Sequence, residues 1–275
     1  MNMALKNKVA TALHTDMGRV RKNNEDAIGE NPDIGLLILA DGMGGYNAGE
    51  IASGLAISTI LETVKKGWKT LPRGEIDAST GNSHEALLLK SAVEHAHKTI
   101  HQVSQTQPQC AGMGTTVVTC LFHDDRLSIA YVGDSRLYRL RQGRLEQVTR
   151  DHSLLEELIA RGHYKRDEAR KLVRKNIVTR ALGVEAEVKV DILEDPIDVG
   201  DVILICSDGL CDMVDDEGIR LTLSKFTDNL PQAAKALVNL ANEHGGKDNV
   251  SVALARVDAS LIPGARWYKQ LMEWF

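Results

Sequence analysis

The sequence predicts an α+β fold, with antiparallel sheets and helices packed outside them. Strand-like apolar runs at residues 116–122, 126–132 and 136–140 are separated by only a few residues. Parallel neighbours need a crossover of about a dozen residues or more, so these runs pair as antiparallel strands. Helical periodicity at residues 50–65 and 84–104 supplies the helices. These observations disfavour a doubly wound parallel sheet.

The remaining elements complete this pattern in chain order. Further strands are predicted from short apolar runs at residues 36–40, 188–192, 202–207 and 250–257. A third helix is predicted at residues 231–244. Residues 67–83 contain Pro72, Gly74 and Gly81, and we interpret them as a turn-rich surface connection.

Composition restricts both the location and the partners of the chain. With 275 residues it can bury one substantial core. Its 33 basic and 38 acidic residues give a formal charge of -5, which argues against nucleic acid or an anionic membrane as a partner. No apolar run approaches the roughly 20 residues of a spanning helix, and residues 1–16 lack a secretory pattern. We therefore expect no membrane insertion and a cytoplasmic location.

The last residues, 263–275, are interpreted as a separate amphipathic extension. Its apolar residues recur at helical spacing, and they are Trp267, Tyr268, Leu271, Met272, Trp274 and Phe275. We expect the extension to pack on its own domain and the protein to be a monomer. The alternative is a docking patch for a partner or for a second copy of the chain.

Acidic residues beside glycines or at strand ends are the main chemical signal of the sequence. They lie in five short motifs, at residues 24–26, 41–45, 133–136, 207–212 and 247–249. Two apolar runs lead into Asp41 and Asp208, so two buried strands are predicted to deliver carboxylates to one sheet edge. Oxygen ligands favour Mg2+ or Mn2+ over zinc or copper. The cysteines and histidines show no spacing typical of a zinc site. The sequence thus predicts metal-dependent chemistry on an oxyanion.

The order of these motifs resembles that of the metal-dependent type 2C protein Ser/Thr phosphatases, the PPM family, and its bacterial branch fits best. The shared segments are residues 16–26, 41–45, 114–116, 133–136, 179–183, 207–210 and 248–249. The resemblance extends over residues 10–257. It implies an αββα sandwich of two antiparallel sheets flanked by helices, with a dinuclear metal site at one sheet edge. Residues 1–262 then form a single phosphatase domain with a flap at about residues 150–180.

The resemblance also implies an activity and its partners. Family members hydrolyse phosphoserine and phosphothreonine by direct attack of a metal-bound water, without a phosphoenzyme intermediate. We therefore expect phosphorylated proteins as substrates, and a cognate bacterial Ser/Thr kinase whose action the chain reverses. Two tightly bound Mn2+ or Mg2+ ions are expected, together with a third, weaker ion.

Metal ligands carry over from the family to four positions. Asp41 bridges both ions, the Gly42 carbonyl adds a ligand to one, and Asp208 and Asp248 bind the other. Glycine fits position 42, because a backbone oxygen reaches a cation only where the chain turns closely without a Cβ in the way. Asp41, Asp208 and Asp248 are thus the implied catalytic residues.

Further site residues have less direct roles. By resemblance, Glu25 and Asp26 act on the metals through water, and Asp134 holds the third ion together with Asp208. An alternative for Asp134 is to cap the turn between two strands. Arg21 is our candidate for phosphate binding, because its planar guanidinium matches two phosphate oxygens.

The general acid is the point at which the chain departs from part of the family. Some members carry a histidine two residues after the bridging aspartate and propose it as the acid. This sequence has Met43 there, and a thioether cannot donate a proton. Water or another side chain must then protonate the leaving group. His152 is a conceivable substitute, although a histidine at a helix start is more often structural.

Two other functions compete with the protein phosphatase. A small-molecule phosphomonoesterase would use the same ions and a deeper pocket with few basic rim residues. A phosphoprotein-binding signalling module would have lost a metal carboxylate. Residues 161–180 hold eight basic and two acidic residues, and we interpret them as a basic face that steers phosphoproteins to the metals. The alternative is a solvated helical pair.

Overall fold

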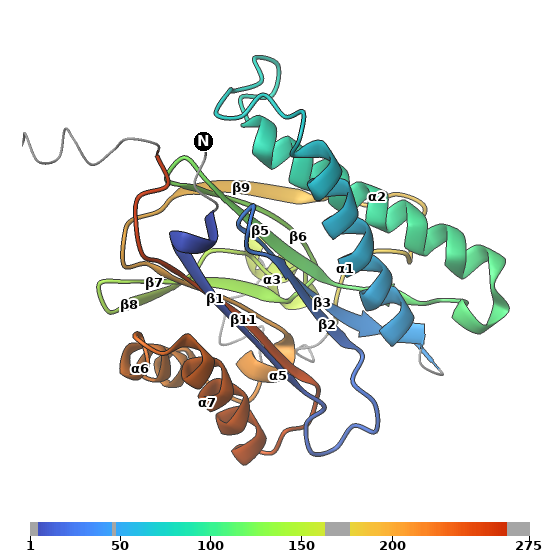
Figure 1. The fold of residues 1–275 in the computed structure, drawn as a ribbon. Helices are drawn as coiled ribbons and strands as arrows, with labels where there is room; N and C mark the ends of the chain where they lie inside the picture. Colours follow the sequence, from blue (N-terminus) through green and yellow to red (C-terminus); the bar gives the residue numbers. More distant parts are fainter. Residues whose placement is uncertain (1–4, 46–47, 163–176, 263–275) are drawn as a thin grey trace, which may run out of the picture.

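Two antiparallel sheets lie face to face between two layers of helices (Figure 1). The structure is a computed structural model that describes residues 5–45, 48–162 and 177–262. The first sheet has the strand order β1-β11-β10-β7-β8. Its strands are β1 (Val9–Asp16), β7 (Arg136–Arg141), β8 (Arg144–Gln147), β10 (Val202–Cys206) and β11 (Val250–Val257).

The second sheet has the order β2-β3-β5-β6-β9, and the short β4 pairs with β3 beside this path. Its strands are β2 (Asp26–Asn31), β3 (Leu36–Met43), β4 (Gly114–Thr115), β5 (Val117–His123), β6 (Arg126–Val132) and β9 (Asp191–Pro196). All strand pairs in both sheets are antiparallel. The predicted strand direction is therefore confirmed.

Helices cover the outer face of each sheet. Those on the second sheet are α1 (Ala48–Gly67) and α2 (His84–Thr106), and those on the first are α6 (Asp216–Lys225) and α7 (Leu230–Glu243). Short segments complete the described chain: α3 (Leu154–Ala160), α5 (Asp208–Cys211) and the 3-10 turns η1 (Leu5–Asn7) and η2 (Pro108–Cys110). Among the described helices, none is long and apolar enough to cross a membrane.

Strand β3 shows why its sequence is a continuous apolar run. Leu37 and Leu39 point into the core between the sheets, whereas Leu36 and Ile38 point into the core under α1 and α2. Successive side chains of a strand face opposite sides, so a strand buried on both faces is apolar at every position. The same arrangement holds β10 between the central core and α7.

The predicted elements are largely present, with differences at the exposed strands. The prediction for residues 188–192 begins too early, because β9 starts at Asp191 and its residues are only half-buried. The flap predicted at about 150–180 is described at its ends alone. Residues 163–176, with most of the predicted basic face, lie outside the described residues, as does the extension at 263–275.

Candidate active site

Strand ends from both sheets bring five aspartates to one edge of the sandwich. Asp26 begins β2 and faces Asp41 near the end of β3 in the antiparallel register. Asp208 lies two residues after the end of β10 as the first residue of α5, Asp248 lies two residues before β11, and Asp134 lies in the turn between β6 and β7. We call these five residues the sheet-edge cluster.

The carboxylates of the sheet-edge cluster destabilise one another's charged forms. Burial, followed by the charges of Asp26, Asp208, Asp134 and Asp248, raises the pKa of Asp41 well above its ordinary value. Burial and neighbouring aspartates raise the pKa of Asp208 to about 8. Burial is also the main reason why the pKa of Asp26 and that of Asp134 rise to about 6. The edge therefore carries more negative charge than the protein alone balances.

The donor set fits hard divalent cations. Asp26 Oδ1 is buried and has no hydrogen-bond partner among the described residues, while Asp26 Oδ2 accepts a bond of 2.9 Å from Ser207 Oγ. The cluster offers carboxylate oxygens, with neither imidazole nor thiolate among its five members. Mg2+ and Mn2+ prefer such ligands. A buried oxygen without a donor beside other carboxylates is where a bound cation lowers the free energy most.

Glycines at the edge allow backbones to approach each other closely. A Cβ at Gly42 would lie 2.2 Å from Gly49 O and 2.6 Å from Glu25 O. A Cβ at Gly209 would lie 1.9 Å from Asn249 O. Neither distance is compatible with a side chain. The glycines next to Asp41 and Asp208 thus let the motif segments pack backbone against backbone.

Asn249 is a structural anchor of the site whose role the sequence did not reveal. Its Nδ2 donates to Met17 O at 3.0 Å and to Asn23 O at 2.8 Å, and its Oδ1 accepts from Glu25 N at 2.8 Å. One buried side chain therefore holds the β1–β2 loop at both ends. The signal available in the sequence was only its position after Asp248.

Hydroxyl groups of Ser207 and Thr115 hold Asp26 and Asp41, and the sequence did not predict these hydrogen bonds. Ser207 Oγ donates to Asp26 and accepts from Ser251 N at 3.0 Å, which links β2 to the first sheet. Thr115 Oγ1 donates to Asp41 O at 2.8 Å, and Thr116 N donates to the same oxygen at 2.9 Å. These bonds fix the backbone from which the Asp41 carboxylate projects.

Glu25 and Arg21 lie on the β1–β2 loop that Asn249 holds. Burial is the largest cause that raises the pKa of the Glu25 carboxyl, and the charges of Asp248 and Glu50 also raise it. Arg21 Nη2 donates to Asp248 Oδ2 at 2.6 Å, and half of the Arg21 side chain is exposed. This hydrogen bond is the main cause that raises the pKa of the Arg21 guanidinium. Arg21 thus places an accessible cation beside the sheet-edge cluster.

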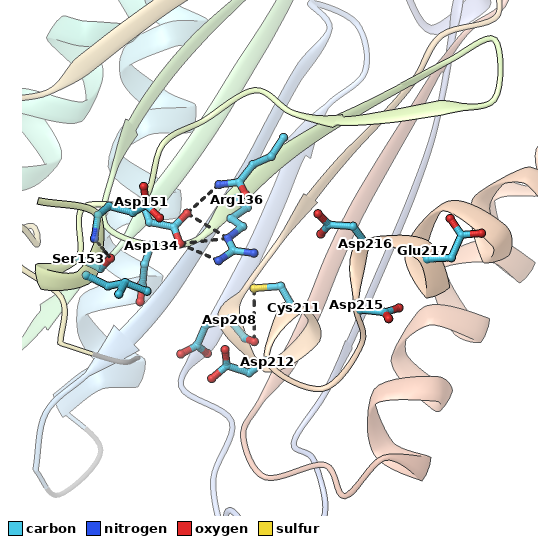
Figure 2. Close-up of a pocket in the computed structure, with 13 residues that line it drawn as sticks. Asp134, Arg136, Asp151, Ser153, Asp208, Cys211, Asp212, Asp215, Asp216 and Glu217 are labelled. Carbon is cyan, nitrogen blue, oxygen red and sulfur yellow. Dashed lines mark hydrogen bonds and ion pairs between the residues drawn. The ribbon is translucent and has the colours of Figure 1, made fainter. Parts of the chain in front are cut away.

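A cavity of about 650 Å³ opens from the cluster towards α6. Figure 2 shows Asp208 and Asp212 across this cavity from Arg136, with Asp215, Asp216 and Glu217 along one side. Of its thirteen lining residues eight are acidic, and Arg136 is the one arginine. Arg136 Nη2 is bound by Asp151 Oδ2 at 2.7 Å. The approach to the site therefore has a strongly acidic wall.

Three residues near the site are excluded from proton or group transfer. His152 is buried, its Nδ1 accepts from Gly133 N at 3.1 Å, and its Nε2 contacts Asp191 Oδ2 at 3.2 Å. Both ring nitrogens are thus occupied, and burial lowers the pKa of His152. The Cys211 thiol donates to Asp208 O and its pKa is raised, so it is not a nucleophile. Met43 has no proton to donate.

The fold and the sheet-edge cluster define an αββα phosphatase with an oxygen-lined metal site. The chain belongs to the protein phosphatase 2C family, whose model matches residues 18–242. It is 38% identical to the serine/threonine phosphatase stp of Listeria monocytogenes over 90% of this chain and 95% of that protein. It is 37% identical to the serine/threonine protein phosphatase PstP of Mycobacterium tuberculosis over 90% of this chain and 44% of that protein.

Solved structures show the same architecture. The crystal structure of Mycobacterium tuberculosis PstP matches with a TM-score of 0.81 at 34% identity, covering 92% of this chain and 100% of that chain. A structure of the PstP catalytic domain with two manganese ions matches with a TM-score of 0.78 at 35% identity, over 92% and 99%. The predicted family and the predicted fold class are confirmed.

Proposed function

We propose that this chain is a protein phosphatase that hydrolyses phosphoserine and phosphothreonine with the help of Mn2+ or Mg2+. The observation that carries the proposal is the sheet-edge cluster, whose buried carboxylates raise one another's pKa and whose Asp26 Oδ1 has no donor among the described residues. When bound there, two divalent cations supply the positive charge that activates water and neutralises a phosphate.

The residues of the edge have distinct proposed roles. The charges of all four other aspartates raise the pKa of Asp41, which supports a role for Asp41 in holding both ions. Asp208 and Asp248 would hold one ion, and the Gly42 carbonyl would supply a ligand to the other. We assign Asp134 to a third, weaker ion, since its pKa responds to burial and to the acids of the adjacent cavity.

Two further acidic residues would act on the metals through bound water. Asp26 keeps one oxygen fixed by Ser207 and leaves the other free to accept from a water molecule. The main chain of Glu25 is held by Asn249 and Ser53, so its carboxylate has a fixed origin beside Gly49. Both residues can orient the attacking water by accepting its protons.

Arg21 binds the phosphate in this mechanism. Its guanidinium now pairs with Asp248, and a planar fork of donors can instead bind two phosphate oxygens. The two positions considered for the general acid do not fit that role: Met43 lacks a proton, and His152 is buried with both ring nitrogens engaged. Solvent water therefore protonates the departing serine or threonine oxygen.

The acidic cavity bears on the choice of substrate. A small phosphorylated metabolite is itself an anion, and a wall of Asp212, Asp215, Asp216 and Glu217 repels it. A phosphoprotein can instead present basic side chains to this wall. We propose phosphoproteins as substrates, a cognate bacterial Ser/Thr kinase as functional partner, a monomeric state and a cytoplasmic location. The substrate class and the kinase are supported by the resemblance to the bacterial branch, whereas the location follows from composition and the monomeric state from the expected packing of residues 263–275 on their own domain.

The test uses the purified full chain and a phosphothreonine peptide. We expect hydrolysis with added Mn2+ or Mg2+ and none after exhaustive chelation, with activity restored when the metal returns. Peptides with basic residues beside the phosphothreonine should be cleaved faster than acidic ones. Activity that survives complete chelation would refute the metal mechanism, and faster turnover of small phosphorylated metabolites would refute the proposed substrate class.

A further inference from the structure

A second group of potential metal ligands lies at the opposite end of the second sheet. It comprises Glu85 in the first turn of α2, His123 at the end of β5 and Asp124 in the turn that follows, and we call it the His123 cluster. Its ligand atoms all lie within 4.8 Å of one another. Strands β3 and β5 are antiparallel, with Leu39 opposite Val118 and Leu36 opposite Leu121. His123 is therefore remote from Asp41, and the α1–α2 loop beside it lies far from α5 in Figure 1.

Two buried polar atoms face each other in this cluster without a partner. The Glu85 side chain is fully buried and the His123 side chain is 5% exposed. Glu85 Oε2 and His123 Nδ1 are 3.9 Å apart, and neither has a hydrogen-bond partner among the described residues. Asp124 Oδ2 lies 4.0 Å from the same nitrogen. Buried polar atoms rarely lack a hydrogen-bond partner, so we expect a bound group between Glu85 Oε2 and His123 Nδ1.

The hydrogen bonds around His123 indicate which nitrogen carries its proton. His123 Nε2 lies 2.7 Å from Ser128 Oγ, and the Ser128 hydroxyl donates to Glu194 Oε1 at 3.4 Å. Ser128 therefore accepts from Nε2–H, and we assign the lone pair of the neutral ring to Nδ1. Nδ1 lies 3.9 Å from Glu85 Oε2 and 4.0 Å from Asp124 Oδ2. Three electron-rich atoms that converge in this way require a positive charge between them.

A metal ion satisfies these atoms better than a proton does. The separation of 3.9 Å is too long for a direct hydrogen bond between Nδ1 and Glu85. Zinc ligands lie about 2.0–2.2 Å from the ion, so tetrahedral ligand atoms are about 3.3–3.6 Å apart. A small inward movement of Glu85 and Asp124 would reach that spacing.

The surroundings resemble those of a built metal site. A metal-binding histidine usually donates its other N–H to an oriented oxygen, as His123 does through Ser128 and Glu194. Gly74 N in the α1–α2 loop donates to Glu85 Oε1 at 3.0 Å. Gly74 has a φ of +74°, and a Cβ there would lie 3.1 Å from Asp124 Oδ2. Asp124 is 44% exposed and leaves a route for the ion.

We propose that Glu85, His123 and Asp124 bind one divalent transition-metal ion of the zinc class, at a structural site separate from the phosphatase site. One imidazole and two carboxylates suit zinc, whereas magnesium prefers oxygen ligands alone. The ion joins the α1–α2 loop and the start of α2 to the β5–β6 turn. Its role is to hold this loop, because the cluster is too remote from the sheet-edge cluster to meet the phosphate.

The test measures zinc in the full chain after all metals have been stripped with a chelator. The protein is dialysed against limiting zinc with excess Mg2+, and bound metal is then counted by elemental analysis. We expect about one zinc per chain in the wild type, in Asp248→Asn and in His95→Gln, which removes an exposed histidine. We expect less than about a tenth of that in Glu85→Gln and His123→Gln.

Two further readouts protect the test against a folding defect. Asp124→Asn changes only the partly exposed ligand, and we expect it to fold and to bind zinc at least about tenfold more weakly. Cobalt(II) in place of zinc should give a visible spectrum that changes in Asp124→Asn and not in His95→Gln. Zinc should raise the melting temperature of the wild type and of His95→Gln, and should raise that of Asp124→Asn less.

Three outcomes would overturn the proposal. The first is that the wild type takes up no zinc at these concentrations, which would leave His123 and Glu85 as a buried ion pair. The second is zinc uptake that Glu85→Gln and His123→Gln do not change. The third is zinc uptake lost in Asp248→Asn, which would assign the metal to the sheet-edge cluster. The proposed phosphatase activity can fail without altering any of these counts.

Discussion

The two ends of the second sheet gather buried charge in different ways. The sheet-edge cluster contains only carboxylates and opens into an acidic cavity. The His123 cluster contains one imidazole, lies under the α1–α2 loop and places its three ligand atoms closer together than any trio of the sheet-edge aspartates does among the described residues. An open site with excess charge can exchange substrate and product. A cluster whose two carboxylates one divalent cation would balance is suited to holding an ion.

The cost in stability separates the two regions as well. Four carboxylates of the sheet-edge cluster have raised pKa values, so the folded chain destabilises itself there. Such strain is expected where function requires it, because selection for stability alone would remove it. In the His123 cluster, a single cation would satisfy both orphaned atoms. The following predictions test this contrast, from the largest expected effect to the smallest.

Asp208→Asn should have the largest effect on turnover. It removes one ligand charge while keeping the shape of the side chain. Changes to groups that only support metal ligands cost about 10–100-fold, so loss of a ligand should reduce kcat by more than about 100-fold. The matched variant Glu85→Gln should keep the kcat of the wild type on the same phosphothreonine peptide. Wild-type turnover in Asp208→Asn would contradict the ligand assignment.

The pH dependence of the free energy of unfolding should reveal the excess negative charge of the sheet-edge cluster. The pKa of Asp208 is about 8 and that of Asp26 about 6 in the folded chain, against an ordinary value of 3.8. Between about pH 4 and about pH 8, the folded chain therefore keeps protons that the unfolded chain has lost. The free energy of unfolding falls as pH rises through this range. In chelator we expect a loss of up to about 1.4 kcal/mol per pH unit for each such proton.

Urea unfolding between about pH 5 and about pH 8 measures this slope. Asp208→Asn should show a shallower slope, since one of the raised groups is gone. Saturating Mn2+ should flatten the slope further, because the ions keep the carboxylates ionised at lower pH. Stability that increases with pH across this window in chelator would show that the sheet-edge cluster does not repel itself.

Asn249→Ala should weaken metal binding without removing a ligand. The β1–β2 loop loses three hydrogen bonds, and Glu25 N is left without its acceptor. We expect stability to fall by about 1–3 kcal/mol and the Mn2+ concentration needed for activity to rise by about 10–100-fold. Asn242→Ala, at a comparably buried asparagine on α7, should lower stability with little change in the Mn2+ requirement. Equal metal requirements in the two variants would remove Asn249 from the site.

The sequence predicted the parts of the molecule that local patterns determine. The run into Asp41 is apolar at each position because β3 is buried on both faces, so it was easily recognised. Strand β2 was missed because it is half-buried and contains Gly29, where a Cβ would lie 2.5 Å from Ile57 Cγ2. Gly29 allows α1 to pack closely on β2, and a local sequence pattern does not reveal a contact of this kind.

The features of both clusters that the sequence did not predict are contacts between residues far apart in the chain. Asn249 holds Glu25 across 224 positions of the chain, and Gly74 was predicted only as part of a surface connection. His123 and Glu85 belong to different elements, so their approach depends on how α2 packs against the sheet. Motif order could indicate the sheet-edge cluster, because the family repeats it. Nothing in the sequence spacing could indicate the His123 cluster.

Arg21→Ala should have the smallest effect among the site variants. Whether KM or kcat changes is more informative than the size of the change. Arg21 is half exposed and holds no ion, so its removal leaves the carboxylates in place. If the guanidinium contacts the phosphate equally in the ground and transition states, KM rises by about tenfold while kcat stays unchanged. Lys22→Ala, which removes an exposed cation from the next position, should leave both constants unaltered. The same loss in both variants would reduce Arg21 to a general electrostatic contribution, and a fall in kcat alone would mean that its contact forms only in the transition state. A rise in KM confined to Arg21→Ala would place a phosphate-binding cation at the sheet-edge cluster.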